Sequence, residues 1–205
     1  MSSEVEICNS ALVKLGVGTT GRITSLTEGS KNANLCNEQY AKLRDQLLRK
    51  HLWNFAKERV KLAQLSETPV SGFDYQYQLP SDLMRVLAVH DNDASRGTIR
   101  YEIKGDRLLS DANEIYLIYV KKVTDPNEMD ELFLECLALS IAKDIALAVT
   151  ASRTVKADMR DDLRREIAHA KSIDAIEDWP EEFPDSSWVT ARGGNMSGPW
   201  GWGNT

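Results

Sequence analysis

The chain of 205 residues is poor in the side chains that build disulfide frameworks and metal centres, since it holds only three cysteines and three histidines. The cysteines are widely spaced without a CxxC pair, which argues against a disulfide framework and a structural zinc site. They fall on predicted apolar helix faces and are expected to be buried free thiols. The histidines fall in three different predicted elements without an HExxH motif, so we expect no metal and no cofactor. These residues are Cys8, Cys36, Cys136, His51, His90 and His169.

The chain also lacks an excess of basic residues, a secretory leader and a membrane-spanning run. Its 31 acidic and 25 basic residues give a formal net charge of −6, unlike the basic field that non-specific phosphate binding needs. The start, MSSEVEICNS, has neither a basic nor an apolar region, so synthesis in a cytoplasm without secretion is expected. The most apolar run, residues 132–149, is short for a bilayer and contains Glu135, Lys143 and Asp144. It predicts a core helix.

Tryptophan is concentrated at one end of the chain, because four of the five lie in the last 27 residues. Residues 177–205 show no periodicity, and five acidic residues against one arginine give them a net charge of −4. Burying a tryptophan removes about 150–250 Å² from water, so an extension that left four of them exposed would lose that stabilisation and aggregate. We therefore predict a docking tail that is disordered alone and binds a partner or a neighbouring subunit. Its predicted anchors are Trp179, Phe183, Trp188, Trp200 and Trp202.

Hydrophobic periodicity predicts four helices, over residues 4–15, 30–63, 126–150 and 152–176. Ser3 and Glu6 form a capping box for the first, and Asp125 followed by Pro126 starts the third. Ser30 is expected to cap the second helix, whose apolar stripe continues through Trp53.

Between the second and third helices the period changes to two, and short connections require antiparallel strands. Residues 75–79, YQYQL, place both tyrosines on one face and both glutamines on the other, and residues 104–107 predict a tight hairpin with Gly105 at positive φ. The expected fold class is α+β. Residues 1–176 form a four-helix bundle-like core with a small antiparallel β-sheet inserted at residues 75–120, and residues 177–205 form the extended tail.

One motif resembles a dinucleotide-binding fingerprint. Gly16, Gly18 and Gly21 form a literal GxGxxG, but the mechanism requires a strand before the glycines and a helix opening at their end. Here a predicted helix precedes them, so a helix C-cap followed by a loop is the favoured interpretation. The chain has no GxSxG or SxxK motif either, and the carboxylates of the fourth helix alternate with arginines as on a solvated face.

A basic run covers residues 42–61, with seven basic against two acidic residues. It predicts either a solvated helix face or a docking surface for an acidic partner. The complement within this chain is the acidic tail, from the same copy or a neighbouring one. Nucleic acid is the other candidate, although the aromatic residues here fit the apolar stripe better than a stacking platform. The predicted inter-subunit face consists of Arg44, Arg49, Lys50, Lys57, Arg59 and Lys61.

Several segments resemble the head-to-tail adaptor proteins of tailed bacteriophages, of the tail tubular protein A type. They are ICNSALVKLG, ITSLTEGSKNANLC, YAKLRDQLLRKHLWNFAKERVKLA, YQYQLPSDLMRVLAV, YEIKGDRLLSD and IYLIYVKKVTDP, in consistent order over about residues 5–150. LLRKHLWNFA and QLPSD are the most specific. The Trp-rich tail has no counterpart in the resemblance.

The resemblance implies a virion protein without catalysis, present as a ring of twelve copies at the head–tail junction and assembled in the host bacterial cytoplasm. Its partners would be the portal protein and the tail nozzle protein, and double-stranded DNA would pass through the lumen without specific binding. Portal docking would fall to the fourth helix and the tail. Nozzle contact would fall to the loops at residues 91–97 and 104–107, with Asp91, Asn92, Asp93, Arg96, Lys104 and Asp106.

Two other classes of function stay open from the sequence. One is an enzyme, either a nucleotide-binding protein that uses the loop from Gly16 to Gly21 or a cell-wall hydrolase. The other is a free cytosolic interaction module, which would form a small stable oligomer instead of a portal-dependent ring.

Overall fold

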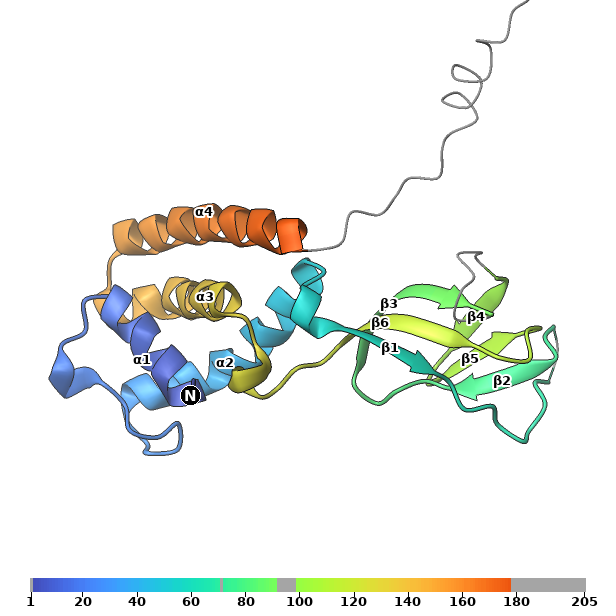
Figure 1. The fold of residues 1–205 in the computed structure, drawn as a ribbon. Coiled ribbons are helices and arrows are strands. Elements are labelled where there is room, and N and C mark those ends of the chain that lie inside the picture. Colours follow the sequence, from blue (N-terminus) through green and yellow to red (C-terminus); the bar gives the residue numbers. More distant parts are fainter. Residues whose placement is uncertain (1, 71, 92–98, 178–205) are drawn as a thin grey trace, which may run out of the picture.

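The computed structural model describes residues 2–70, 72–91 and 99–177. Mixed helices and small antiparallel sheets confirm the predicted α+β class (Figure 1). The helices are α1 (Glu4–Lys14), α2 (Lys31–Lys50), α3 (Glu131–Thr150) and α4 (Arg153–Glu177). The strands are β1 (Lys57–Lys61), β2 (Tyr75–Gln78), β3 (Leu83–His90), β4 (Tyr101–Lys104), β5 (Arg107–Ser110) and β6 (Tyr116–Lys121).

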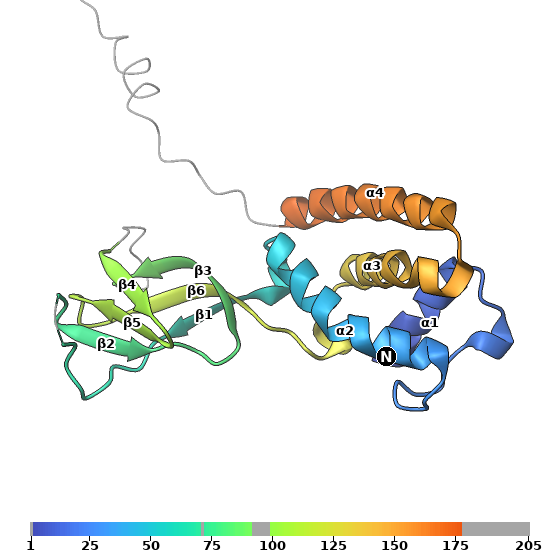
Figure 2. The ribbon, with the colours of Figure 1, turned by 180° about the vertical axis from the view of Figure 1, so that it is seen from behind.

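The helices lie at one end of an elongated molecule and the strands at the other, as both views show (Figures 1 and 2). α3 is apolar on nearly all sides, and it packs against α1, α2 and α4. The capping box predicted for α1 is present, because the Ser3 hydroxyl accepts from the Glu6 backbone N–H and the Glu6 carboxylate accepts from the Ser3 N–H. All four predicted helices are present among the described residues, although the end of the second and the start of the third differ from the prediction.

The strands form two three-stranded antiparallel sheets, in the orders β1-β6-β3 and β2-β5-β4, where one small sheet was expected. A second hydrophobic core, which includes Tyr77, Leu108 and Leu117, lies with these strands. The hairpin between β4 and β5 is confirmed, with Gly105 at φ +63° as a primed turn requires. The face that carries the glutamines is partly covered, since Gln76 is buried and its amide donates to the Glu67 carbonyl and accepts from Arg107.

The second helix ends at Lys50, so its predicted extension to residue 63 is wrong. His51 is extended, a short 3-10 turn covers Asn54–Ala56, and the chain then enters β1. Trp53 is nevertheless in the core, as its place in the apolar stripe predicted, and its indole N–H donates to the Leu47 carbonyl at 3.0 Å. That carbonyl is one of those that a helix end leaves without an intrahelical partner.

The third helix begins five residues later than predicted. Asp125 and Pro126 do start a helical turn, but it is a single 3-10 turn, and Met129 returns to extended backbone. Asp130 then caps α3 through hydrogen bonds from the Leu132 and Phe133 backbone N–H groups. Two consecutive capping signals thus replace the single helix start read from the sequence.

An ionic cluster ties α2 to the segment that leaves β6. Arg44 is only 5% exposed, and its guanidinium donates twice to one carboxylate oxygen of Asp45, at 2.8 and 3.0 Å. The other oxygen of Asp45 lies 2.7 Å from the Lys122 ammonium. Burial raises the pKa of Asp45, but the hydrogen bonds from Lys122 and Arg44 outweigh it and hold the pKa below its usual value.

We expect Asp45→Asn to lower the free energy of unfolding by about 3 kcal/mol at pH 7, because Arg44 would stay buried without an anionic partner. A carboxylate with a lowered folded-state pKa stabilises the protein above its unfolded pKa, and this stabilisation is lost as the pH falls through the folded value. The gap between variant and wild type should therefore narrow below about pH 4. Thermal unfolding at pH 7 and at successively lower pH measures this, with the exposed Asp158→Asn as control. A gap that stays constant as the pH falls would contradict the expectation.

Candidate basic groove

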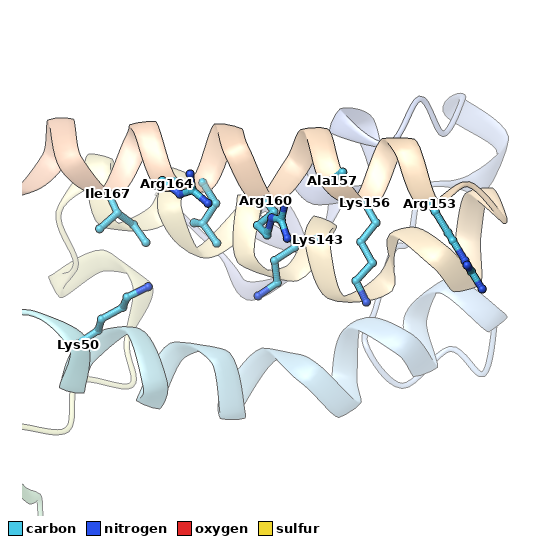
Figure 3. Close-up of a pocket in the computed structure, with 9 residues that line it drawn as sticks. Lys50, Lys143, Arg153, Lys156, Ala157, Arg160, Arg164 and Ile167 are labelled. Carbon is cyan, nitrogen blue, oxygen red and sulfur yellow. The ribbon is translucent and has the colours of Figure 1, made fainter.

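A groove of about 670 Å³ lies between α2 and α4 at the helical end of the molecule. Figure 3 shows Lys50 of α2, Lys143 of α3 and Lys156 of α4 directed into the space between α2 and α4. We call this the basic groove. Its lining residues are Lys50, Lys143, Arg153, Lys156, Ala157, Arg160, Leu163, Arg164 and Ile167.

The groove exists because α2 and α4 flank α3 and run in the same direction. At one end, the Lys31 ammonium donates to the Ala148 carbonyl near the end of α3, and α4 begins three residues after α3. At the other end, the Asp174 carboxylate of α4 lies 2.9 Å from His51 Nε2 and accepts from the Asn54 backbone N–H at 3.0 Å. We call this contact the Asp174 bridge. It joins the end of α4 to the segment after α2.

Six of the lining residues are cationic and none is acidic. Asp144 lies 3.0 Å from Lys143, and Asp161 lies 3.7 Å from both Arg160 and Arg164. Within the part of the chain that the structure describes, Lys50, Arg153 and Lys156 have no ion pair, and all three are exposed. The groove therefore presents uncompensated positive charge next to an apolar strip formed by Ala157, Leu163 and Ile167.

Sequence reasoning missed this groove because it treated α4 as a helix of mixed charge. The cations at positions 153, 156, 160 and 164 recur every three or four residues, which places them on one face of a helix. Asp158, Asp161 and Asp162 line a neighbouring surface with Arg165, and this surface shares Arg164 with the groove. The spacing of the cations alone was the signal that could have located the face.

The predicted inter-subunit basic face is divided between two elements, because α2 ends before β1 begins. Lys50 lines the basic groove and Arg49 is exposed nearby on α2, whereas Arg44 is buried against Asp45. Lys57, Arg59 and Lys61 lie on β1, at alternate positions along a strand at the edge of its sheet. Lys61 is 2.8 Å from Glu114.

The predicted nozzle loops are described only in part. Asp91, Lys104 and Asp106 are exposed at the sheet end of the molecule, whereas Asn92, Asp93 and Arg96 lie outside the described residues. The hairpin turn contacts the residue that follows β2, because the Asp106 carbonyl accepts from the Leu79 backbone N–H at 2.9 Å. All five predicted tail anchors, Trp179, Phe183, Trp188, Trp200 and Trp202, also lie outside the described residues.

The GxGxxG segment terminates α1. Gly16 has φ +78°, its N–H donates to the Val13 carbonyl, and the Val17 N–H donates to the Leu12 carbonyl, which together form a Schellman motif. The segment that follows is held by Asn32, whose side chain donates to the Gly21 carbonyl. Because a helix and not a strand precedes the glycines, the pyrophosphate geometry of a dinucleotide site is not built here.

The cysteines are buried thiols, as the sequence predicted. Burial raises the pKa of Cys136 to about 12, and a hydrogen bond with Cys36 together with burial raises the pKa of Cys8. Cys8 and Cys136 therefore stay protonated at neutral pH, whereas the hydrogen bond with Cys8 lowers the pKa of Cys36. Among the residues that the structure describes, no group of three or more histidine, cysteine, aspartate or glutamate side chains could hold a metal ion. Nor is any described helix both long and apolar enough to cross a bilayer.

No family model matches this chain, and no curated protein matches it.

Proposed function

We propose that this chain is the head-to-tail adaptor of a tailed bacteriophage. In this proposal it is a structural virion protein, twelve copies of which form a ring between the portal and the tail nozzle and continue the DNA channel. A four-helix bundle-like core with its C-terminal tail faces the portal, and the hairpin loops of the sheets face the nozzle.

The observation that carries the proposal is the separation of two chemically different surfaces at opposite ends of one elongated molecule (Figure 1). The helical end presents the basic groove, whereas α4 ends near the junction with the sheets, and the acidic, tryptophan-rich segment follows it in the sequence. The sheet end presents the exposed Asp91, which directly follows β3. A protein that joins two different partners along an axis needs distinct surfaces at both ends.

The charge distribution is compatible with a channel through which DNA slides. Residues 1–176 carry a net charge of −2, since the tail accounts for −4 of the −6. A nearly neutral body would not hold DNA by the dense cationic contacts of a nucleic-acid-binding protein. Four of the six cations of α4 line one groove instead, which suits a contact between proteins.

Imaging the purified protein alone and with the portal of the same virus by electron microscopy tests the proposal. We expect a closed ring on the portal, with the helical end toward it and the sheets pointing away, since a heterologous interface repeats until the ring closes. A small closed oligomer that forms equally without the portal would contradict the proposal and favour a free interaction module.

A further inference from the structure

We propose that the basic groove is a peptide-binding site, and that residues 179–185 of a neighbouring copy of this chain occupy it. The inference deepens the adaptor proposal, because it names the contact that would join one copy to the next in the ring. The groove and its charge do not depend on that proposal.

The chemistry of the segment complements the chemistry of the groove. Residues 179–185, WPEEFPD, combine three carboxylates with two aromatic side chains. The groove offers six cations beside an apolar strip. Carboxylates on guanidinium and ammonium groups form the stronger, charge-assisted hydrogen bonds, and aromatic rings on an apolar strip add buried area. A phosphate backbone would use the cations but leave the apolar strip without a partner, so an acidic, aromatic peptide fits better than a nucleic acid.

The length of the segment also matches the groove. On α4 the lining extends from Arg153 to Ile167, about 21 Å at 1.5 Å per residue. Six or seven extended residues cover about 21 Å. A residue before a proline is biased toward extended backbone, and Trp179 and Phe183 both precede prolines. This bias lowers the entropy that the segment loses on binding.

Chain geometry assigns the segment to a neighbouring copy. Ile167 is the lining residue closest to the C-terminus of α4. It lies ten residues before Glu177, which is about 15 Å along the helix axis. Trp179 is two residues beyond Glu177 and can be at most about 7 Å from it. The chain would also have to pass the Asp174 bridge, which joins α4 to the segment after α2. Residues 179–185 therefore cannot fill the groove of their own copy from end to end.

The test titrates a fluorescein-labelled peptide of residues 178–188 with the full-length protein at low salt and follows anisotropy. We expect saturable binding that Lys156→Glu/Arg160→Glu weakens tenfold or more. Arg22→Glu/Arg85→Glu makes the same change of charge at exposed positions outside the groove and should alter the affinity less than twofold. A peptide with lysine in place of Glu181, Glu182 and Asp185 should bind the groove variant better than it binds the wild type.

Equal affinity of the groove variant and its control would overturn the proposal. So would displacement of the peptide by a short DNA duplex at a lower concentration than by unlabelled peptide, which would assign the groove to nucleic acid. A monomeric full-length Glu181→Lys/Glu182→Lys protein that binds the peptide more than tenfold tighter than monomeric wild type would show that the groove is filled by its own tail and would also overturn the proposal. Ring formation on the portal is imaged in a separate experiment, so failure of this inference and failure of the adaptor proposal are distinguishable.

Discussion

Replacing Trp53 by alanine is expected to lower the free energy of unfolding by about 3–5 kcal/mol. The Trp53 side chain is 1% exposed, and its ring meets Phe133 edge to face at 5.2 Å between centroids and His51 at 4.9 Å. The substitution creates a cavity where α2, α3 and the entry to β1 meet. It also removes the indole donor from the Leu47 carbonyl. Both effects destabilise the same region, because the carbonyl belongs to the last turns of α2.

Chemical denaturation followed by far-ultraviolet circular dichroism measures this loss, since helix content does not depend on the fluorescence of the removed residue. Trp53→Phe separates the two effects, because it keeps an aromatic ring but leaves the Leu47 carbonyl without its donor, and about 1–3 kcal/mol should be lost. Val13→Ala, at an exposed position of α1, should stay within about 0.5 kcal/mol of wild type. A loss below about 1 kcal/mol for Trp53→Ala would contradict the packing described for this core.

Removing residues 178–205 is expected to abolish attachment to the portal, with a loss of affinity of at least a hundredfold. The physical reason is that few residues carry most of the binding energy of an interface, tryptophan prominent among them, and this segment holds four. Co-sedimentation or surface-based binding with purified portal measures the affinity. A thermal melt of the shortened protein establishes whether the helical and sheet parts remain folded.

A full-length variant controls for indirect effects of removing the whole segment. Trp200→Ser/Trp202→Ser changes only the glycine-rich end of the tail, beyond residues 179–185, and should weaken portal attachment while leaving the peptide affinity of the basic groove intact. Attachment of the shortened protein with wild-type affinity would refute the docking role of the tail. Loss of attachment in the deletion but not in the tryptophan variant would move that role to other residues of the segment.

Local signals in the sequence determined the helices whose caps and periodicity agree. Ser3 with Glu6 defined the start of α1, and the break between α3 and α4 was placed within one or two residues. The end of α2 was missed because Trp53 continues the apolar stripe of the helix although its backbone is extended. Whether a side chain is buried depends on its position in the folded protein. A periodic apolar stripe in the sequence does not show where the backbone stops being helical.

Features that depend on contacts distant in sequence were beyond local reasoning. Residues 57–61, KERVK, contain a single apolar residue and form a strand only because they pair with β6, about 60 residues later. The same holds for the basic groove, which needs Lys50 to lie opposite α4. The spacing of the cations at positions 153, 156, 160 and 164 places them on one helix face. It does not reveal which element lies opposite that face.

The pairing of β1 with β6 has a mechanical consequence. These two neighbouring strands connect the helical end to the sheets: β1 enters at Lys57 and β6 leaves opposite it, at Val120. Tension along the molecule would pull on β1 and β6 at the same end of their ladder. The two strands would therefore not slide past each other, and the force would be shared between two covalent connections. The sheet end could then transmit tension or compression as a rigid body, without any hydrogen bond between β1 and β6 having to break.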